Sequence, residues 1–357
     1  MILFQYFVIA SLYFPSLTYC NCRRVGRKSE SSLTVYWINL DRSVERRVSF
    51  SEQMIDLQIR NMRIPAITPS NLKVPSDVGG SRQDANYAKC QFETNQTFEM
   101  TPNSDQTLFF IAGLCGRPKN TLKELAVTVS HLYAIYTALN TNDTSKYAII
   151  AEDDVLIPFD VDYDSLILSA PKDFAILQLL TSNDKLLKRN YKTYLQNGTY
   201  LWKPRENHHA INDYWCAGFY IIKKECFSRV LNTIITPINS KAFRVKVIAG
   251  YEDKGCVPSE CCEVKDKIIR RKYPPCVHSP RGYSADHFIY SLFIEQTYMI
   301  TVPFITSATA ANQSTLHQEQ VGMHATAFDS INRIISSMKK GKSPMPNFTR
   351  PLTSDCT

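Results

Sequence analysis

The chain has 357 residues, of which 44% are hydrophobic and 11% aromatic, and its formal charge at pH 7 is +8. This apolar content is enough for a packed core and excludes an intrinsically disordered chain. The length allows one large domain or two smaller ones. Basic residues are spread along the sequence apart from short runs at 265–272 and 339–342, a distribution that argues against nucleic-acid binding.

The first nineteen residues carry no charge. An apolar segment of this kind predicts a signal peptide over 1–20, although the usual basic start is missing. The alternative is an uncleaved membrane anchor, but Gln5 and Pro15 make such a span marginal. Five N-x-S/T sequons and eleven cysteines, ten after cleavage, favour an oxidising lumen with disulfide bonds. We therefore expect a protein of the endoplasmic reticulum or Golgi lumen, or a secreted one, without a membrane span after cleavage.

The elements predicted after this segment begin with a strand over 33–40, where an apolar run enters a polar turn. A helix follows, because apolar residues recur at near-helical spacing: Val44, Val48, Ile55 and Ile59. Residues 66–118 are rich in Ser, Asn, Pro, Gly and Gln. We expect them to be irregular apart from short strands.

The clearest predicted helix starts where Thr121 and Glu124 form a T-x-x-E capping box. Its apolar residues alternate three and four apart: Leu122, Leu125, Val129, Leu132, Tyr136 and Leu139. Apolar runs that begin at Tyr147, Phe174 and Trp215 predict three further strands, the last of which leads into a helix. Strands that alternate with helices predict an α/β fold with a mainly parallel sheet.

Four cysteines lie among charges and prolines near 250–283, which predicts a cystine-stapled insertion. A zinc site is the alternative, but the spacing lacks a C-x2-C pair. The tail over 336–357 carries three prolines and is expected to be flexible. We therefore expect one domain over 21–335 that contains the insertion.

Glu152, Asp153 and Asp154 directly follow an apolar run, at the strand end where α/β sheets bind ligands. On an extended strand end, Glu152 and Asp154 face one side and Asp153 the other. Such an acid-x-acid pair suits Mg²⁺ or Mn²⁺ bound to a diphosphate. An acidic turn after a buried strand explains the triplet equally well. The chain contains no G-x-G-x-x-G, H-E-x-x-H or G-x-S-x-G motif.

Five longer motifs occur along the chain in order. They are VYWINLDRSVERR from Val35, ELAVTVSHLYAIYTAL from Glu124, YAIIAEDDVLI from Tyr147, WCAGFYIIKKECFSRVL from Trp215 and YSADHFIYSL from Tyr283. In order and approximate spacing they resemble glycosyltransferase family 25, which includes lipooligosaccharide and procollagen hydroxylysine galactosyltransferases. The family's I-N-L-x-x-S-x-x-R, S-H, E-D-D and late Asp have these counterparts: Ile38, Asn39, Leu40, Ser43 and Arg46; Ser130 and His131; Glu152, Asp153 and Asp154; and Asp286.

Two positions depart from the family pattern. Lys123 stands where the family usually has a glycine before the acid, and AVTV replaces a pair of small residues before S-H. A close approach between this helix and a ligand is therefore in doubt.

The resemblance implies a GT-A fold, a UDP-sugar donor and Mn²⁺ or Mg²⁺. Glu152 and Asp154 are the expected metal ligands, and Asp153 supports them or contacts the donor. Asp286 is the candidate base that takes the proton of the acceptor hydroxyl, and Asp213, Glu252 and Asp253 are the alternatives for this role. For Asp286 the alternative reading is an ordinary helix N-cap.

The resemblance also points to three donor-binding residues, which are Asn39, Arg46 and His131. For Arg46 the alternative is an exposed helix charge, and for His131 a core histidine with satisfied hydrogen bonds. The expected function is transfer of a hexose, galactose by the resemblance, to a hydroxyl of a glycoprotein or glycan, with collagen-like acceptors included. Two rivals are a secreted binding or adhesion protein without turnover and a metal-dependent phosphohydrolase.

Overall fold

The computed structural model describes residues 33–74, 106–115, 122–198, 201–204, 215–248, 284–307 and 321–352. The predicted signal peptide and the predicted cysteine-rich insertion lie outside these residues. So do Thr121 of the capping box and the alternative bases Asp213, Glu252 and Asp253. Within the described part of the chain, no helix is both long and apolar enough to cross a membrane.

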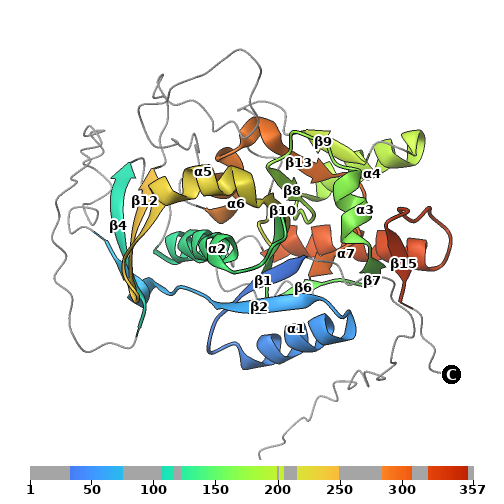
Figure 1. The fold of residues 1–357 in the computed structure, drawn as a ribbon. Coiled ribbons are helices and arrows are strands. Elements are labelled where there is room, and N and C mark those ends of the chain that lie inside the picture. Colours follow the sequence, from blue (N-terminus) through green and yellow to red (C-terminus); the bar gives the residue numbers. More distant parts are fainter. Residues whose placement is uncertain are drawn as a thin grey trace, which may run out of the picture.

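A seven-stranded sheet forms the centre of the molecule (Figure 1). Its strands are β1 (Thr34–Asn39), β2 (Arg60–Pro65), β5 (Tyr147–Glu152), β8 (Ile176–Gln178), β9 (Trp202–Pro204), β10 (Phe219–Lys223) and β13 (Thr297–Ile300). The spatial order is β2-β1-β5-β10-β8-β13-β9. The pairings give β2, β1, β5, β8 and β13 one direction and β10 and β9 the opposite one. The prediction of an α/β fold with a mainly parallel, mixed sheet is therefore confirmed.

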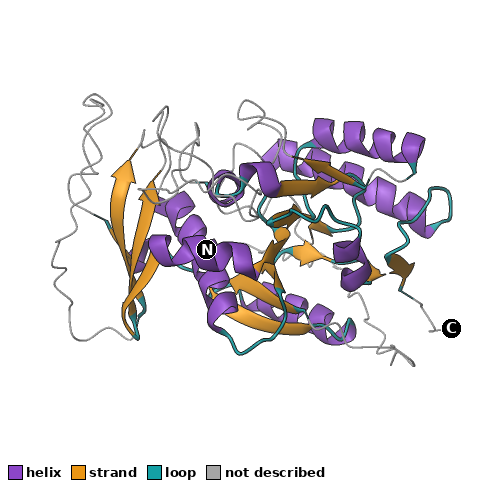
Figure 2. Cartoon of the chain, turned by 45° about the horizontal axis from the view of Figure 1, so that its top comes forward, coloured by secondary structure: helices purple, strands orange, loops and turns teal. Residues whose placement is uncertain are grey.

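Helices cover both faces of this sheet (Figure 2). They are α1 (Val44–Asp56), α2 (Leu122–Asn140), α3 (Tyr163–Leu168), α4 (Asp184–Asn197), α5 (Lys224–Ile234), α6 (Ala285–Ser291) and α7 (Val321–Lys339). Alternate residues of β1 enter different cores: Tyr36 packs with α2, α5 and α6, whereas Trp37 packs with α1, α3, α4 and α7. This division follows from the two-residue period of a strand.

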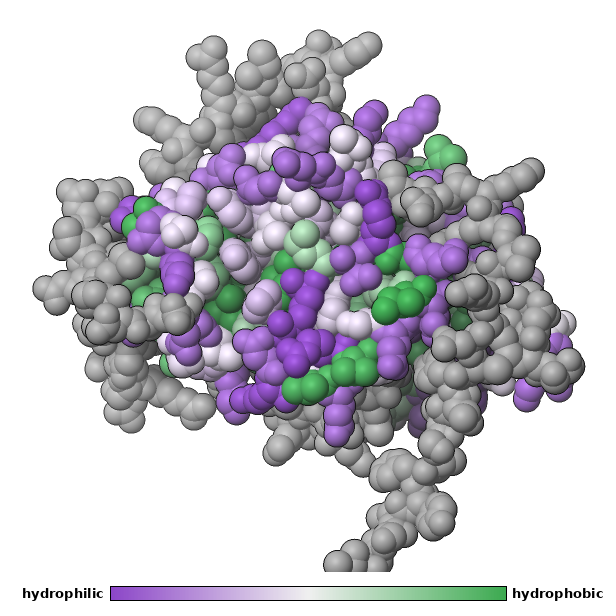
Figure 3. All heavy atoms as spheres, turned by 60° about the horizontal axis from the view of Figure 1, so that its bottom comes forward, coloured by the Kyte–Doolittle hydropathy of each residue, from purple (hydrophilic) through white to green (hydrophobic). Residues whose placement is uncertain are grey.

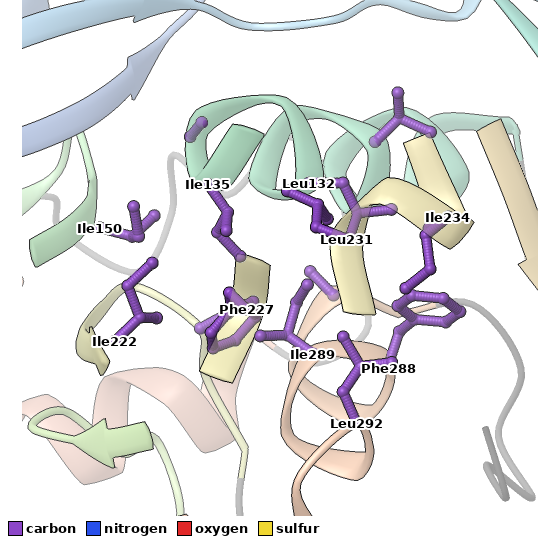
Figure 4. Packing of buried hydrophobic residues seen from close by; sticks show 14 of the residues in the cluster. Leu132, Ile135, Ile150, Ile222, Phe227, Leu231, Ile234, Phe288, Ile289 and Leu292 are labelled. Carbon is purple, nitrogen blue, oxygen red and sulfur yellow. The ribbon is translucent and has the colours of Figure 1, made fainter. Parts of the chain in front are cut away.

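The core between α2, α5 and α6 is shown in Figure 4, where Leu132 and Ile135 of α2 lie close to Phe227 and Leu231 of α5. The predicted helix over this region is confirmed. Its buried surface is wider than the predicted stripe, since ten of its residues are buried. Leu122, the first residue of that stripe, is instead 51% exposed.

A second sheet was not predicted. It consists of β3 (Leu72–Lys73), β4 (Leu108–Cys115), β11 (Ile235–Asn239) and β12 (Ala242–Ile248), in the order β11-β12-β4-β3. β4 lies in a segment expected to be largely irregular. It pairs with β12, more than a hundred residues later, and Phe109 stacks on Phe243 with ring centroids 5.4 Å apart. Such distant pairing has no signature in the local composition.

The remaining elements are short. They are η1 (Pro69–Asn71), η4 (Ile294–Gln296), β6 (Val155–Leu156) with its partner β14 (Thr306–Ser307), and β7 (Phe159–Val161) with its partner β15 (Thr349–Pro351).

The prediction of a flexible tail from residue 336 onward is wrong for residues 336–352. Helix α7 continues to Lys339, and β15 then pairs with β7. Phe348 is 1% exposed and packs edge-on against Phe304, with ring centroids 5.2 Å apart. The buried Phe348 therefore holds this segment in place despite the prolines nearby.

The predicted helix α1 is confirmed, but it ends before Ile59, and the other three apolar residues used to predict it face solvent. Val44, Val48 and Ile55 are 49%, 48% and 70% exposed. Figure 3 turns this lower side of the molecule toward the viewer and shows hydrophobic side chains among hydrophilic ones. The buried face instead holds Phe50 and Met54, and Phe50 contacts Trp37 of β1 with ring centroids 5.0 Å apart.

This assignment of the buried face of α1 predicts opposite outcomes for two adjacent residues. Met54→Ala removes a side chain that is 0% exposed and should lower the free energy of unfolding by at least about 2 kcal/mol. Ile55→Ala should change it by less than about 0.5 kcal/mol, because Ile55 packs on little else. Urea denaturation of both variants checks the pair. Equal losses of unfolding free energy in the two variants would show that the buried face of α1 has been assigned incorrectly.

Candidate functional site

The candidate site lies at the edge of the large sheet where β1 and β5 end. Asn39 is the last residue of β1 and Glu152 the last of β5, and the strands are in register with Ile38 opposite Glu152. β10 runs antiparallel to β5, so its first residue, Phe219, lies at the same edge opposite Ala151. The sheet thus brings Asn39, the acidic triplet and the turn before β10 together.

The acidic triplet does not continue the strand, because Asp153 and Asp154 form a turn. The expectation that Glu152 and Asp154 share one side, with Asp153 on the other, therefore does not describe the structure. The Arg46 guanidinium contacts both aspartates, with Nη1 3.1 Å from an oxygen of Asp153 and 3.7 Å from one of Asp154. Glu152 instead contacts His131.

Asp153 is the buried member of the triplet, with 8% of the residue exposed. The Nδ2 amide of Asn39 donates a 2.6 Å hydrogen bond to its Oδ2, and Arg46 contacts its Oδ1. Burial raises the pKa of Asp153, and Arg46 and Asn39 oppose that rise by stabilising the carboxylate. Asp153 is therefore held by the protein on both oxygens.

Arg63 is a residue of this site that sequence reasoning missed. It lies on β2, where its Nε donates a 2.9 Å hydrogen bond to the side-chain oxygen of Asn39. A second donor of the guanidinium contacts the backbone carbonyl of Asn39 at 3.3 Å and the carboxylate of Asp41. These contacts fix the amide so that its nitrogen faces Asp153. The only relevant signal is the pairing of β2 with β1, which no local motif reveals.

His131 lies under Glu152 and is 1% exposed. Its Nε2 is 3.2 Å from Oε1 of Glu152, and its Nδ1 is 3.1 Å from the hydroxyl of Tyr220 on β10. The neighbouring Ser130 accepts a hydrogen bond from the backbone N–H of Ile67 and donates one to Ala126. Ser130 thus links α2 to the backbone at Ile67, whereas His131 links α2 to β5 and β10.

Asp286 lies in the first turn of α6 and contacts Cys216, which precedes β10. Its Oδ2 accepts a 3.2 Å hydrogen bond from the backbone N–H of Cys216, and its Oδ1 accepts one from that of His287. Burial raises the pKa of Asp286, but His287 and the two backbone N–H groups outweigh it, so the net shift is downward. Asp286 is not the N-cap of α6, which is Ser284.

Cys216 connects Asp286 with the acidic triplet. Its backbone has φ +87°, a strained conformation for a residue with a side chain. Besides the bond from Cys216 to Asp286, the Tyr290 hydroxyl donates to the Cys216 carbonyl at 3.0 Å. Burial and the carboxylates of Glu152, Asp154 and Asp286 all raise the pKa of the thiol. The thiol therefore stays protonated at neutral pH and lies within electrostatic range of all three acids.

Two carboxylates at this edge remain accessible, those of Glu152 and Asp154. Among the described residues, no three His, Cys, Asp or Glu side chains group as ligands for a metal ion. A closed cage made by the protein is thus not what these residues form. The Glu152 and Asp154 side chains are 36% and 27% exposed, and two accessible carboxylates suit Mg²⁺ or Mn²⁺ that also binds water and phosphate. Arg46 offsets one of the three negative charges of the triplet, so a net charge of about −2 is left for a cation to balance.

The predicted site residues therefore form two groups. A chain of contacts links Asn39, Arg46, His131 and the acidic triplet. Asp286 instead contacts Cys216, whose thiol lies within electrostatic range of Glu152 and Asp154. Tyr220 is a second residue that the sequence analysis did not select. Its position in an apolar strand gave no sign that its hydroxyl meets His131.

Comparison with known proteins identifies the family. A search of curated protein sequences found no match. The family model described as glycosyltransferase family 25 (LPS biosynthesis protein) matches residues 32–242, more than half of the chain. The mixed α/β architecture with its large mixed sheet is consistent with a GT-A-like fold. The chain belongs to glycosyltransferase family 25.

Proposed function

We propose that the protein transfers a hexose, galactose by preference, from a UDP-sugar to a hydroxyl of a glycoprotein in the secretory pathway, with collagen-like acceptors included. Mn²⁺ or Mg²⁺ is the proposed cofactor, with Glu152 and Asp154 as its ligands. The observation that carries this proposal is that the three acids of the triplet differ in burial and in their contacts. Asp153 is buried and held by Asn39 and Arg46, which leaves two partly exposed acids at the edge of the sheet.

A divalent ion held by Glu152 and Asp154 would supply positive charge to the departing diphosphate. The protein's own contribution begins with Arg46, whose guanidinium is 27% exposed beside both aspartates and presents a further cation to the phosphates. Positive charge that is already in place where negative charge develops lowers the barrier to transfer.

Asp286 is the proposed acceptor of the proton from the attacking hydroxyl. Its lowered pKa keeps it ionised at neutral pH, as a base must be. Each carboxylate oxygen has two lone pairs, so the two backbone N–H bonds leave acceptor capacity for the hydroxyl. Their second effect is to fix the direction in which the carboxylate points.

A lumenal location is the part of this proposal that concerns the cell. Three of the sequon asparagines lie in the described residues, namely Asn142, Asn197 and Asn347, and all three are exposed. Cys226 is disulfide-bonded, which suits an oxidising compartment. These features support a glycosylated protein of the endoplasmic reticulum, the Golgi or the exterior.

The test is a donor screen with the protein purified from a secretory expression host. Release of UDP from a panel of nucleotide sugars is measured with Mn²⁺, with Mg²⁺ and with EDTA, first without an acceptor and then with glycoprotein acceptors. We expect metal-dependent release from one donor, a UDP-hexose, and recovery of activity when metal is added back. Glu225→Gln, which removes an exposed acid of α5 paired with Arg229, is the matched control and should behave as the wild type.

Absence of turnover with every donor and acceptor, from folded and glycosylated protein, would contradict the proposal. It would favour the alternative of a binding or adhesion protein that keeps the fold. Turnover that is unchanged in EDTA would contradict the cofactor alone.

A further inference from the structure

We infer that His131 is a positioning residue, which donates a hydrogen bond from Nε2 to Glu152 because the Tyr220 hydroxyl occupies its Nδ1. The relevance of this bond to catalysis rests on the proposed function, since it is Glu152 that is proposed to hold the metal–diphosphate. The direction of the bond rests on the structure alone. His131 was expected to bind the donor, but a side chain that is 1% exposed acts through Glu152 instead.

The three residues come from three different elements. His131 belongs to α2, Glu152 ends β5 and Tyr220 lies on β10. Tyr220 is 0% exposed, and its ring stacks on the imidazole at an interplanar angle of 28° with centroids 5.8 Å apart. The stacked Tyr220 ring and the polar contacts of both ring nitrogens hold the imidazole in this orientation.

The Tyr220 hydroxyl decides which ring nitrogen carries the proton. Burial raises the pKa of this phenol well above its usual value, and Glu152 adds to the rise, so the hydroxyl keeps its hydrogen. Among the described residues, Nδ1 of His131 is the one acceptor within hydrogen-bonding distance of that hydroxyl. A buried hydroxyl that donates to nothing is costly. Nδ1 is therefore the acceptor, and Nε2 carries the hydrogen that points to Glu152.

The consequence for Glu152 is a fixed carboxylate. Its side chain is 36% exposed and would otherwise sample several rotamers at the strand end. With Oε1 engaged by Nε2, the carboxylate is held at one oxygen, and its other oxygen has no hydrogen bond to the described residues. Partners of this kind behind a metal-binding carboxylate typically change metal affinity by about 10- to 100-fold.

Two substitutions of the same residue separate this role from general packing. The amide nitrogen of glutamine reaches the place of Nε2, whereas the amide oxygen of asparagine can take the place of Nδ1 and accept the hydrogen bond from Tyr220. His131→Gln thus keeps a donor for Glu152, and His131→Asn keeps a partner for Tyr220 but loses the donor. We expect the dissociation constant of Mn²⁺, measured by electron paramagnetic resonance in the presence of UDP, to rise about 10-fold in His131→Asn and less than about 3-fold in His131→Gln.

The tautomer is measured separately on protein labelled with ¹⁵N-histidine. We expect the wild type to show His131 protonated at Nε2, and Tyr220→Phe to release this preference. Thermal unfolding of each variant is the control for folding. Protonation at Nδ1 in the wild type would overturn the inference, as would equal losses of Mn²⁺ affinity in His131→Gln and His131→Asn. If the wild type binds no metal, the proposed cofactor fails, and the tautomer still decides the direction of the hydrogen bond.

Discussion

Asp154→Asn is expected to lower kcat for sugar transfer by about 10²- to 10³-fold, the scale seen when one charge-stabilising group is removed from an active site. Asp154 is proposed to bind the metal ion that stabilises the negative charge on the departing diphosphate. Its side chain is 27% exposed and adjoins Arg46. The asparagine side chain has nearly the same shape but one oxygen fewer and no charge. Packing at the turn should therefore change little while the electrostatic contribution is lost.

The measurement is steady-state transfer with the donor found in the screen, at saturating and limiting Mn²⁺. Asp164→Asn, an exposed acid in the first turn of α3, is the matched control and should keep wild-type rates. Direct titration of Mn²⁺ shows whether the lost rate coincides with lost metal binding. A variant that transfers sugar at more than a tenth of the wild-type rate would remove Asp154 from the site.

Part of this site could be predicted because its residues stand at strand ends. Asn39 follows the apolar run of β1, and Glu152 ends the run of β5, so a parallel sheet alone brings them to one edge. Arg63 and Tyr220 could not be selected in this way. Their roles depend on which strands pair and in which register, and each lies in a strand whose own pattern is explained by burial or exposure alone.

The same distinction holds for the fold. Helix α2 could be predicted because its buried residues recur with a period that is visible in the local sequence. The sheet that contains β4 depends instead on pairing with the distant strand β12. In α1, both faces carry apolar residues, and periodicity cannot tell which of them meets the sheet. The contact of Phe50 with Trp37 settles that choice, and it exists only in three dimensions.

Asn39→Asp is expected to be the most destabilising single change at the site, by about 3–5 kcal/mol at neutral pH, the cost of leaving a buried charge uncompensated. The substitution replaces the amide that donates to Asp153 at 2.6 Å by a second carboxylate. It also removes the donor to the Ser43 carbonyl, 3.1 Å away. Arg63 still donates to one oxygen at position 39 and Arg46 still contacts Oδ1 of Asp153. The oxygen that replaces the amide nitrogen nevertheless faces Oδ2 of Asp153.

The pH dependence of this loss distinguishes charge repulsion from a missing hydrogen bond. Two carboxylates in contact share a proton, which raises the pKa of Asp153 further above its usual value than burial alone does in the wild type. A group whose pKa is higher in the folded state adds stability at low pH and loses it as the pH rises through the folded-state pKa. The deficit of Asn39→Asp relative to the wild type should therefore shrink as the pH is lowered from about 7.5 toward 5.

Asn39→Ala serves as the control, since it removes the donor without adding charge. It should cost about 1–3 kcal/mol, because Asp153 is left without one of its two partners. Its deficit should vary less with pH than that of Asn39→Asp, because Arg46 still compensates the carboxylate. Urea denaturation of the wild type and both variants at several pH values measures all three curves. If the curves of the two variants run parallel, the contact between positions 39 and 153 carries no charge repulsion, and Asp153 is not the buried acid that Asn39 and Arg46 hold in place.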